Sequence, residues 1–343
     1  MPGLSNRQEF FLGLIVREYV QAAQPVGSKT LVARYALDFS PATVRNEMVA
    51  LTEAGMLRQP HTSAGRVPTD DGYRYFVQRL TADADLPSAE KRTISHQFYQ
   101  AQGDVDQWLR LAASVLAQHS SVASVVTAPS ADRSLLRHLE LISVQARQVQ
   151  LILVLQGGEV LQQMLSPQEP ASQDTLTRIA AQVTACCQGA DAAAVQRVDQ
   201  GLDPLAPEIL RMVAEMMRRA DRSPSPDVIY DGLSNVLNQP EFADRELAQR
   251  AMHLIEEHTL LSGFLARVLA PDVDGVQVVI GGEGQWEDLR DCSMVVARYG
   301  APGLATGALG VLGPVRMAYD RTISAVRYVA TVMSELVTEA FSE

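Results

Sequence analysis

The order of strand-like and helix-like segments limits what this chain can fold into more than any other feature. Three short apolar or alternating runs lie within residues 139–165, and three more lie within residues 276–312. Between them apolar residues recur with helical spacing, as at Ile179, Val183 and Cys187. Strands that give way to a long helical stretch and then return are typical of an α/β domain interrupted by an insertion. We therefore expect an α+β multidomain protein.

A chain of 343 residues exceeds the size of one ordinary core, and changes in its pattern predict the domain boundaries. An N-terminal domain is expected over residues 1–80, and the polar, mixed-charge residues 81–103 are expected to form a linker with some helix. The α/β domain takes two segments, 104–170 and 271–343. The insertion, residues 171–270, is predicted to be mainly helical.

Three methionines of the insertion, Met212, Met216 and Met217, permit two interpretations. Methionine is flexible and serves adaptable binding surfaces. The spacing of these residues with Ile209 and Val213 is also that of a buried helix face. We favour packing in a core or a dimer contact.

Helix-start signals divide the first residues of the chain into three helices. Ser5 and Gln8 have the spacing of a capping box. Ser28 can cap a short second helix, and Ser40 followed by Pro41 marks the start of a third. Two short helices joined by a tight turn are typical of a helix-turn-helix.

The third helix carries polar residues away from its apolar face, namely Thr43, Arg45 and Asn46. In a helix-turn-helix the first turn of the second helix enters the major groove, where arginine pairs with guanine and asparagine with adenine. These residues could equally be solvated positions on an ordinary core helix, and this stretch alone leaves both interpretations open.

The segment after this helix favours the DNA interpretation. Gly55 stands where a helix C-terminal glycine is expected, and strand-like residues 56–59 and 67–69 follow as a pair. The turn between them, residues 60–66, is rich in small, hydroxyl and basic side chains. Such a turn suits a wing lying along phosphates.

Several strings of the sequence resemble the HrcA family of bacterial heat-inducible transcription repressors. The N-terminal strings are SPATVRNEM and QPHTSAGRVPTDDGYRY, and the C-terminal ones are VVIGGEGQWEDLRDCSMVVARYG and GALGVLGPVRMAYDRTISAVRYVATVMSEL. The resemblance implies a winged helix-turn-helix with its recognition helix at Ser40–Met48 and its wing at His61–Arg66. It also implies a GAF-like domain interrupted by an inserted dimerisation domain.

The resemblance further implies the partners and the DNA-contacting residues. The chain would bind double-stranded DNA as a homodimer, at the inverted repeat CIRCE that controls chaperone genes, with its activity dependent on the chaperonin GroEL. Carried over position by position, the DNA-binding residues would be Ser28, Lys29, Ser40, Ala42, Thr43, Arg45, Asn46, His61, Thr62, Ser63 and Arg66.

The net charge of −11 is divided in a way that suits a DNA-binding N-terminal domain. Residues 1–80 hold nine Lys/Arg and seven Asp/Glu, whereas the remaining residues hold 20 and 33. A contact with a polyanion is therefore expected only in the N-terminal domain.

We expect no enzyme, no cofactor and no metal site. Gly281-Gly282-Glu283-Gly284 lacks the lysine and helix start of a phosphate loop and is interpreted as a tight turn. The six histidines show no metal-ligand grouping. A GAF-like fold can hold a small effector, so the alternative function is a small-molecule sensor whose N-terminal domain contacts a protein.

We expect a cytoplasmic location. The first residues lack a basic segment followed by an apolar stretch, and no run has the roughly 18 apolar residues of a membrane helix. Three cysteines make no disulfide framework, which indicates a reducing compartment.

Overall fold

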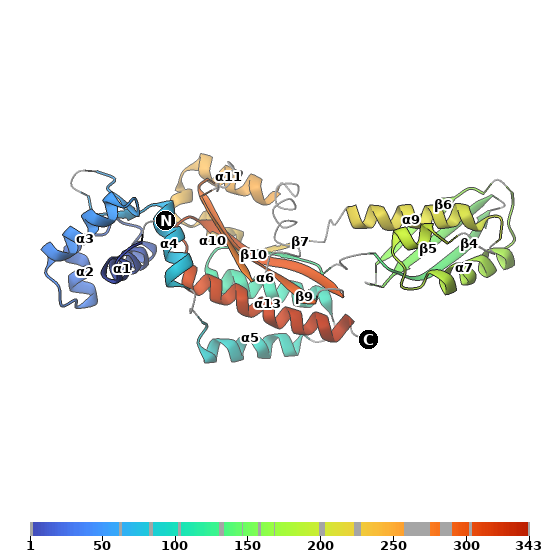
Figure 1. The fold of residues 1–343 in the computed structure, drawn as a ribbon, viewed down its shortest axis with the longest axis horizontal. Helices are drawn as coiled ribbons and strands as arrows, with labels where there is room; N and C mark the ends of the chain where they lie inside the picture. Colours follow the sequence, from blue (N-terminus) through green and yellow to red (C-terminus); the bar gives the residue numbers. More distant parts are fainter. Residues whose placement is uncertain are drawn as a thin grey trace. The chain divides into compact units, whose positions relative to one another are not determined.

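Two antiparallel sheets organise the chain, a five-stranded one and a three-stranded one. The computed structural model describes residues 3–61, 64–81, 85–101, 104–129, 134–145, 147–156, 159–167, 169–198, 203–222, 228–256, 275–281, 290–301 and 304–341. Each sheet belongs to its own compact unit. The larger unit comprises residues 1–128, 227–299 and 307–334, and the inserted unit is built on residues 129–226 (Figure 1).

The N-terminal region of the larger unit is made of helices and one short two-stranded ribbon. Its elements are α1 (Asn6–Ala22), α2 (Ser28–Tyr35), α3 (Pro41–Glu53), β1 (Leu57–Arg58), β2 (Val67–Pro68), α4 (Asp70–Tyr75) and the π-helical turn η1 (Phe76–Leu80). The ribbon is antiparallel and pairs Leu57 with Pro68. No described helix anywhere in the chain is long and apolar enough to cross a membrane.

The helix boundaries of this region follow the sequence signals with one exception. Ser5 and Gln8 form the predicted capping box, and Ser40 caps α3 ahead of Pro41 as predicted. Gly55 adopts a φ of +79° just after α3, which confirms its role at the helix end. The prediction that Ser28 caps the second helix is wrong, because Ser28 is already its first helical residue and Gly27 holds the cap position without a side-chain hydrogen bond.

The five-stranded sheet forms the centre of the larger unit. Its strands lie in the order β7 (Val228–Asp231), β3 (Ala123–Thr127), β10 (Ala305–Pro314), β9 (Cys292–Ala301) and β8 (Val276–Ile280). β3 pairs antiparallel with both β7 and β10, and β8 pairs antiparallel with β9. The strands predicted at 276–280, 292–296 and 308–312 are therefore present.

Helices α6 (Val105–Ser120) and α13 (Tyr319–Phe341) lie next to this sheet, and α5 (Ser88–Gln100) lies beside these helices (Figure 1). Apolar side chains of α13, such as Val326 and Val329, are buried. The helix α5 lies in the segment predicted to be a linker. Its Ile94 and Phe98 are buried. The Ser95 hydroxyl forms a hydrogen bond of 2.6 Å with the Tyr328 hydroxyl of α13. This segment therefore contains a packed helix, because Ile94 and Phe98 are four residues apart and share one buried face.

The larger unit also contains three further described elements. They are α10 (Leu233–Leu237), the 3-10 turn η2 (Pro240–Ala243) and α11 (Arg245–Glu256).

The inserted unit is a three-stranded sheet covered on one face by helices. Its elements are β4 (Leu136–Gln145), β5 (Gln148–Leu155), β6 (Val160–Leu165), α7 (Gln173–Cys187), α8 (Ala192–Gln196) and α9 (Ala206–Arg222). Alternate residues of β5, such as Leu151 and Leu153, share one buried core with Ile179 and Val183 of α7. Met216 and Met217 belong to this core, which confirms that they pack inside.

The division of the chain differs from the predicted one at both ends of the insertion. Strands β4, β5 and β6 were expected in the interrupted domain, but they pair with one another and pack on α7 and α9. The inserted unit thus begins near Pro129 and ends near Pro226, and it combines the three-stranded sheet with α7, α8 and α9. The larger sheet instead uses β3 and β7, two short strands that lie on either side of the insertion and were not predicted.

Candidate nucleic-acid interface

The first turn of α3 is exposed and carries the residues predicted to read bases. The Ser40 hydroxyl accepts a hydrogen bond of 3.1 Å from the Thr43 backbone N–H and lies 2.9 Å from the Thr43 hydroxyl. This cap satisfies an otherwise unpaired helix donor and fixes where α3 starts. Arg45 and Asn46 are exposed on the next residues of the helix. Within the described part of the chain the side chains of both are free of hydrogen bonds and ion pairs.

The opposite face of α3 is buried. Val44, Met48 and Leu51 have almost no exposed surface, and their spacing of four and three residues places them on one side of the helix. α3 packs against both α1 and α2. The helix is therefore held by its apolar face, and its polar face is left for a partner.

Two buried acids in this region are neutralised by arginines. Glu18 of α1 pairs with Arg34 of α2 at 3.0 Å, and Glu47 of α3 forms an ion pair with Arg7 of α1. Both carboxylates are nearly inaccessible. Burial and the nearby Glu18 carboxylate also raise the pKa of Tyr35, which keeps its phenol neutral. These acids therefore add little repulsion toward a phosphate backbone.

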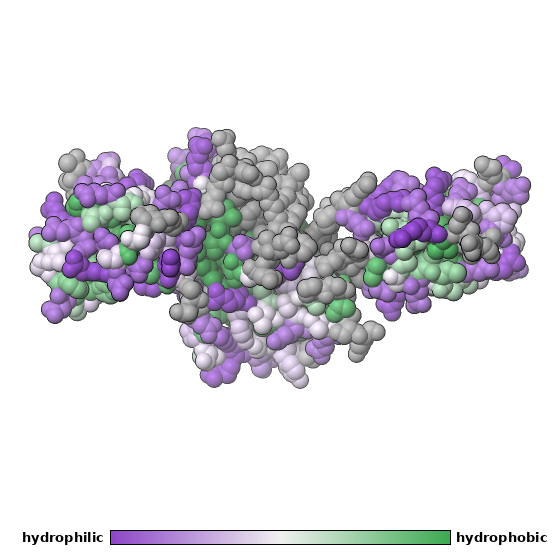
Figure 2. Space-filling view, viewed as in Figure 1, coloured by the Kyte–Doolittle hydropathy of each residue, from purple (hydrophilic) through white to green (hydrophobic). Residues whose placement is uncertain are grey.

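Hydrophilic side chains cover most of the visible face of the N-terminal region in Figure 2.

The ribbon after α3 is anchored to the turn between α1 and α2. Arg66 and Val26 exchange two backbone hydrogen bonds of 2.8 and 2.9 Å. A Cβ on Gly65 would lie 2.3 Å from the Val26 carbonyl oxygen, so only glycine permits this close approach. The Arg66 side chain donates from Nε to the Thr52 hydroxyl of α3 at 3.0 Å. The arginine thus holds the base of the ribbon against α3.

The predicted DNA-binding residues fall into three groups. Ser40, Ala42, Thr43, Arg45 and Asn46 lie together on α3, with Thr43 half-buried and the other four exposed. On α2, Lys29 is exposed and Ser28 is half-buried. In the ribbon, His61 is exposed and Arg66 is half-buried. Thr62 and Ser63 lie outside the described residues.

The sequence analysis missed the residues that support this surface. Thr52, Arg7 and Arg34 are not among the predicted DNA-binding residues. Each one nevertheless holds an element of the region in place through a hydrogen bond or an ion pair. The sequence contained a feature that could have predicted the role of the two arginines. Glu18 and Glu47 stand on helix faces that are otherwise apolar, and a carboxylate there needs a cationic partner.

Comparison with known proteins assigns the chain to a family. Residues 106–323 match the family described as HrcA protein C terminal domain. The heat-inducible transcription repressor HrcA of Roseiflexus castenholzii is 44% identical over 98% of this chain and 96% of its own length. That of Thermomicrobium roseum is 41% identical over 98% of this chain and 96% of its own.

A solved structure has the same fold. The crystal structure of a hypothetical protein, 22% identical, superposes with a TM-score of 0.64 and covers 98% of this chain and 99% of its own. The relatives match over 98% of the chain and the family model over residues 106–323, and this chain belongs to the HrcA family.

Proposed function

We propose that this chain is a sequence-specific DNA-binding transcription repressor, and that its N-terminal region is a winged helix-turn-helix. One observation carries the proposal. Arg45 and Asn46 project from the capped first half of α3 with no partner in the described part of the chain. Arginine and asparagine are the side chains that pair bidentately with guanine and adenine in the major groove.

The other residues of the surface have the chemistry of phosphate contacts. Lys29 at the start of α2 and His61 in the ribbon loop are exposed. Such contacts fix the register of a protein on DNA and carry no sequence information. Arg66 would act mainly by positioning the wing, because its Nε is engaged with Thr52.

We further propose that two copies associate and present two recognition helices to an inverted repeat. The three-stranded sheet leaves its second face uncovered, with Ile142, Val144, Val160 and Met164 between 42 and 55% exposed. Ile142, Gln150 and Met164 form one row across that face. A two-fold contact through the exposed apolar residues of this face suits a dimer, since such an interface is self-complementary.

Membership of the HrcA family supports a more specific operator and regulator. The proposed operator is the CIRCE inverted repeat of chaperone genes, and the proposed regulator is the chaperonin GroEL. During heat stress unfolded protein would occupy the chaperonin, the repressor would lose its folding partner, and chaperone genes would be expressed. A bacterial repressor meets its operator in the cytoplasm, where we place this chain.

The alternative function, a GAF-like small-molecule sensor whose N-terminal region contacts a protein, makes a different prediction. Such a protein would lack DNA affinity at physiological salt. Arg45 and Asn46 would then be replaceable without effect on any duplex.

A salt titration of binding to two duplexes tests the proposal. One duplex carries the CIRCE repeat and the other a scrambled sequence of equal length, each measured with and without GroEL. Specific binding should exceed nonspecific binding by about a thousandfold or more, and Arg45→Ala with Asn46→Ala should abolish the difference. The matched control is Arg79→Ala, an exposed arginine of η1 outside α3. Equal binding to both duplexes in the presence of GroEL would refute the repressor proposal.

A further inference from the structure

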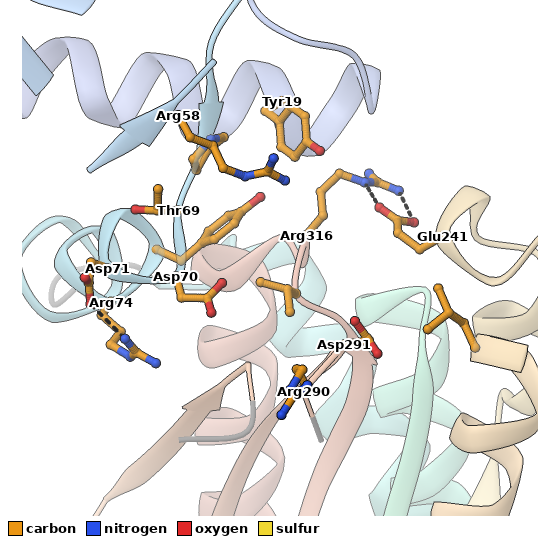
Figure 3. A pocket seen from close by; sticks show the side chains of 14 residues that line it. Tyr19, Arg58, Thr69, Asp70, Asp71, Arg74, Glu241, Arg290, Asp291 and Arg316 are labelled. Atoms are coloured by element: carbon orange, nitrogen blue, oxygen red, sulfur yellow. Dashed lines mark hydrogen bonds and ion pairs between the residues drawn. The ribbon is translucent and has the colours of Figure 1, made fainter. Parts of the chain in front are cut away.

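A cavity of about 580 Å³ lies inside the larger unit, where the N-terminal region meets the five-stranded sheet and its neighbouring helices. Tyr19, Arg58 and Tyr73 line it from the N-terminal region, and Glu241 and Arg316 line it from the rest of the unit. Figure 3 shows Arg58 extending toward the cavity below Tyr19, with Arg316 and Glu241 across from it. Its volume is within the range of small-molecule sites.

Most of the charged groups around the cavity are already paired. Arg316 binds Glu241 through two hydrogen bonds of 2.6 and 3.2 Å. Arg74 binds Asp71 at 2.8 Å. These pairs are structural, because each charge is matched by a neighbour within hydrogen-bonding distance.

Arg58 and Tyr73 are donors at the cavity that lack a partner among the described residues. Across the described ranges, the guanidinium of Arg58 makes no hydrogen bond or ion pair. The Tyr73 side chain is 3% exposed, and its hydroxyl has no hydrogen-bond partner among the described residues. A buried hydroxyl without a partner costs free energy, so a native protein that retains one invites an explanation.

Tyr73 lines the cavity, and its neighbours include other residues of the cavity wall. Its ring packs against Tyr319, with centroids 5.7 Å apart. Burial raises the pKa of Tyr73 well above its usual value, and the charges acting on it include Arg316 and Glu241. The phenol therefore keeps its proton and can donate a hydrogen bond at the wall of the cavity.

An unpaired acid lies on the same cavity. Asp70 is exposed, lies close to Gly281, and makes no hydrogen bond or ion pair within the described ranges. A ligand that places an anionic group at Arg58 would therefore also meet a hydrogen-bond acceptor.

We propose that this cavity binds a small oxyanion, a carboxylate or a phosphate, through Arg58 and the hydroxyl of Tyr73. The acceptor Asp70 favours a ligand that also carries a hydroxyl or amino group. This site is distinct from the proposed DNA surface on α3. Arg58 lies in the ribbon, whereas the ring of Tyr73 packs on Tyr319 of α13, so a ligand held by both residues would connect the ribbon to the body of the unit. Any preference of the ligand for one arrangement would then change DNA affinity, by linkage.

Thermal unfolding of the full chain tests the proposal. The probes are sodium phosphate and sodium lactate, each compared with sodium chloride at equal ionic strength. Phosphate strengthens folding nonspecifically, so the decisive quantity is the difference between variants. The variants are Arg58→Gln and Tyr73→Phe, and the matched control is Arg79→Gln, which removes an exposed arginine outside the cavity.

We expect at least one probe to raise the Tm of the unmodified chain and of Arg79→Gln, and to lose most of that rise in both cavity variants. A response to phosphate alone or to lactate alone identifies the oxyanion. Without probe, Tyr73→Phe should be as stable as the parent, since it removes an unpartnered hydroxyl. Arg58→Gln changes an exposed side chain and should not disturb folding. It therefore tests the site even if Tyr73→Phe folds poorly. Equal Tm rises in all four proteins, or no rise with either probe, would overturn the proposal.

Discussion

The guanidinium of Arg316 meets the carboxylate of Glu241 edge to edge, with Nε 2.6 Å from Oε1 and Nη2 3.2 Å from Oε2. The same guanidinium donates to Gln239 Oε1 at 3.0 Å and to the backbone carbonyl of Val20. Its side chain is only 10% exposed. Arg316, two residues after β10, thereby joins the end of α1 to η2, and it connects the N-terminal region to the sheet-containing part of its unit.

Replacing Arg316 with alanine should destabilise the protein by about 2–3 kcal/mol, because it leaves the partly buried Glu241 without its partner. Glu241→Gln should cost less, since the amide oxygen still accepts from the guanidinium. Chemical denaturation measures both. The control is Arg321→Ala, whose side chain is 56% exposed. Equal losses for the Arg316 and Arg321 variants would mean that the network contributes nothing specific.

Arg66 should affect DNA binding through position as well as charge. Thr52→Val removes the acceptor of Arg66 Nε but keeps the charge, so it should weaken both CIRCE and scrambled duplexes without changing the salt slope. Arg66→Ala should weaken both and lower the slope by about one. Fluorescence anisotropy over a range of salt concentrations separates them. Loss of operator preference alone in the Arg66 variant would contradict its assignment to the wing.

Gly65→Ala should destabilise the N-terminal region by about 1–3 kcal/mol, in the range of overpacked sites. The added Cβ would lie 2.3 Å from the Val26 carbonyl oxygen, a backbone atom that cannot rotate away. Hydrogen exchange at the Val26 and Arg66 amides should accelerate. Gly3→Ala is the control, because nothing lies within 4 Å of its added Cβ. Unchanged exchange in the Gly65 variant would show that the ribbon tolerates a side chain.

The three cysteines are free and should differ in reactivity. Cys186 is exposed and should react with a thiol reagent first, whereas burial raises the pKa of Cys187 and raises that of Cys292 to about 12. A raised thiol pKa contributes stability that is present below the unfolded value of about 8.5 and is lost as pH rises toward the folded value. Thiol labelling and denaturation at pH 7 and pH 10 measure both effects. Fast labelling of Cys292 in the native protein would contradict its burial.

The uncovered face of the three-stranded sheet should carry the proposed dimer. Ile142→Glu with Met164→Glu places two charges in one row of that face and should raise the dimer dissociation constant by about thirtyfold or more. The fold should persist, because both side chains are already exposed. Sedimentation velocity measures the change. Tyr99→Ser, at an exposed aromatic of α5, is the control, and an unaltered dimer in the double variant would place the interface elsewhere.

Local signals in the sequence were sufficient for the parts of the fold that depend on neighbouring residues. The capping box at Ser5 and the start of α3 at Ser40 are hydrogen bonds between residues three apart, so the residue types nearly specify them. The alternating pattern of β5 likewise predicts a strand with one buried face. The positions of Arg45 and Asn46 on the exposed side of α3 follow from the same periodicity.

Local sequence signals could not predict which strands pair with one another. β3 precedes the insertion, and both of its partners, β7 and β10, follow it in the sequence. No local feature of these strands identifies the strand with which each one pairs. The sequence by itself determined the helices, the ribbon and the outward residues of α3, because these depend on hydrogen bonds and periodicity over a few residues. Only the tertiary structure decided which strands share a sheet, where the inserted unit begins and that Arg58 and Tyr73 line one cavity with Arg316, since these contacts join residues far apart in the chain.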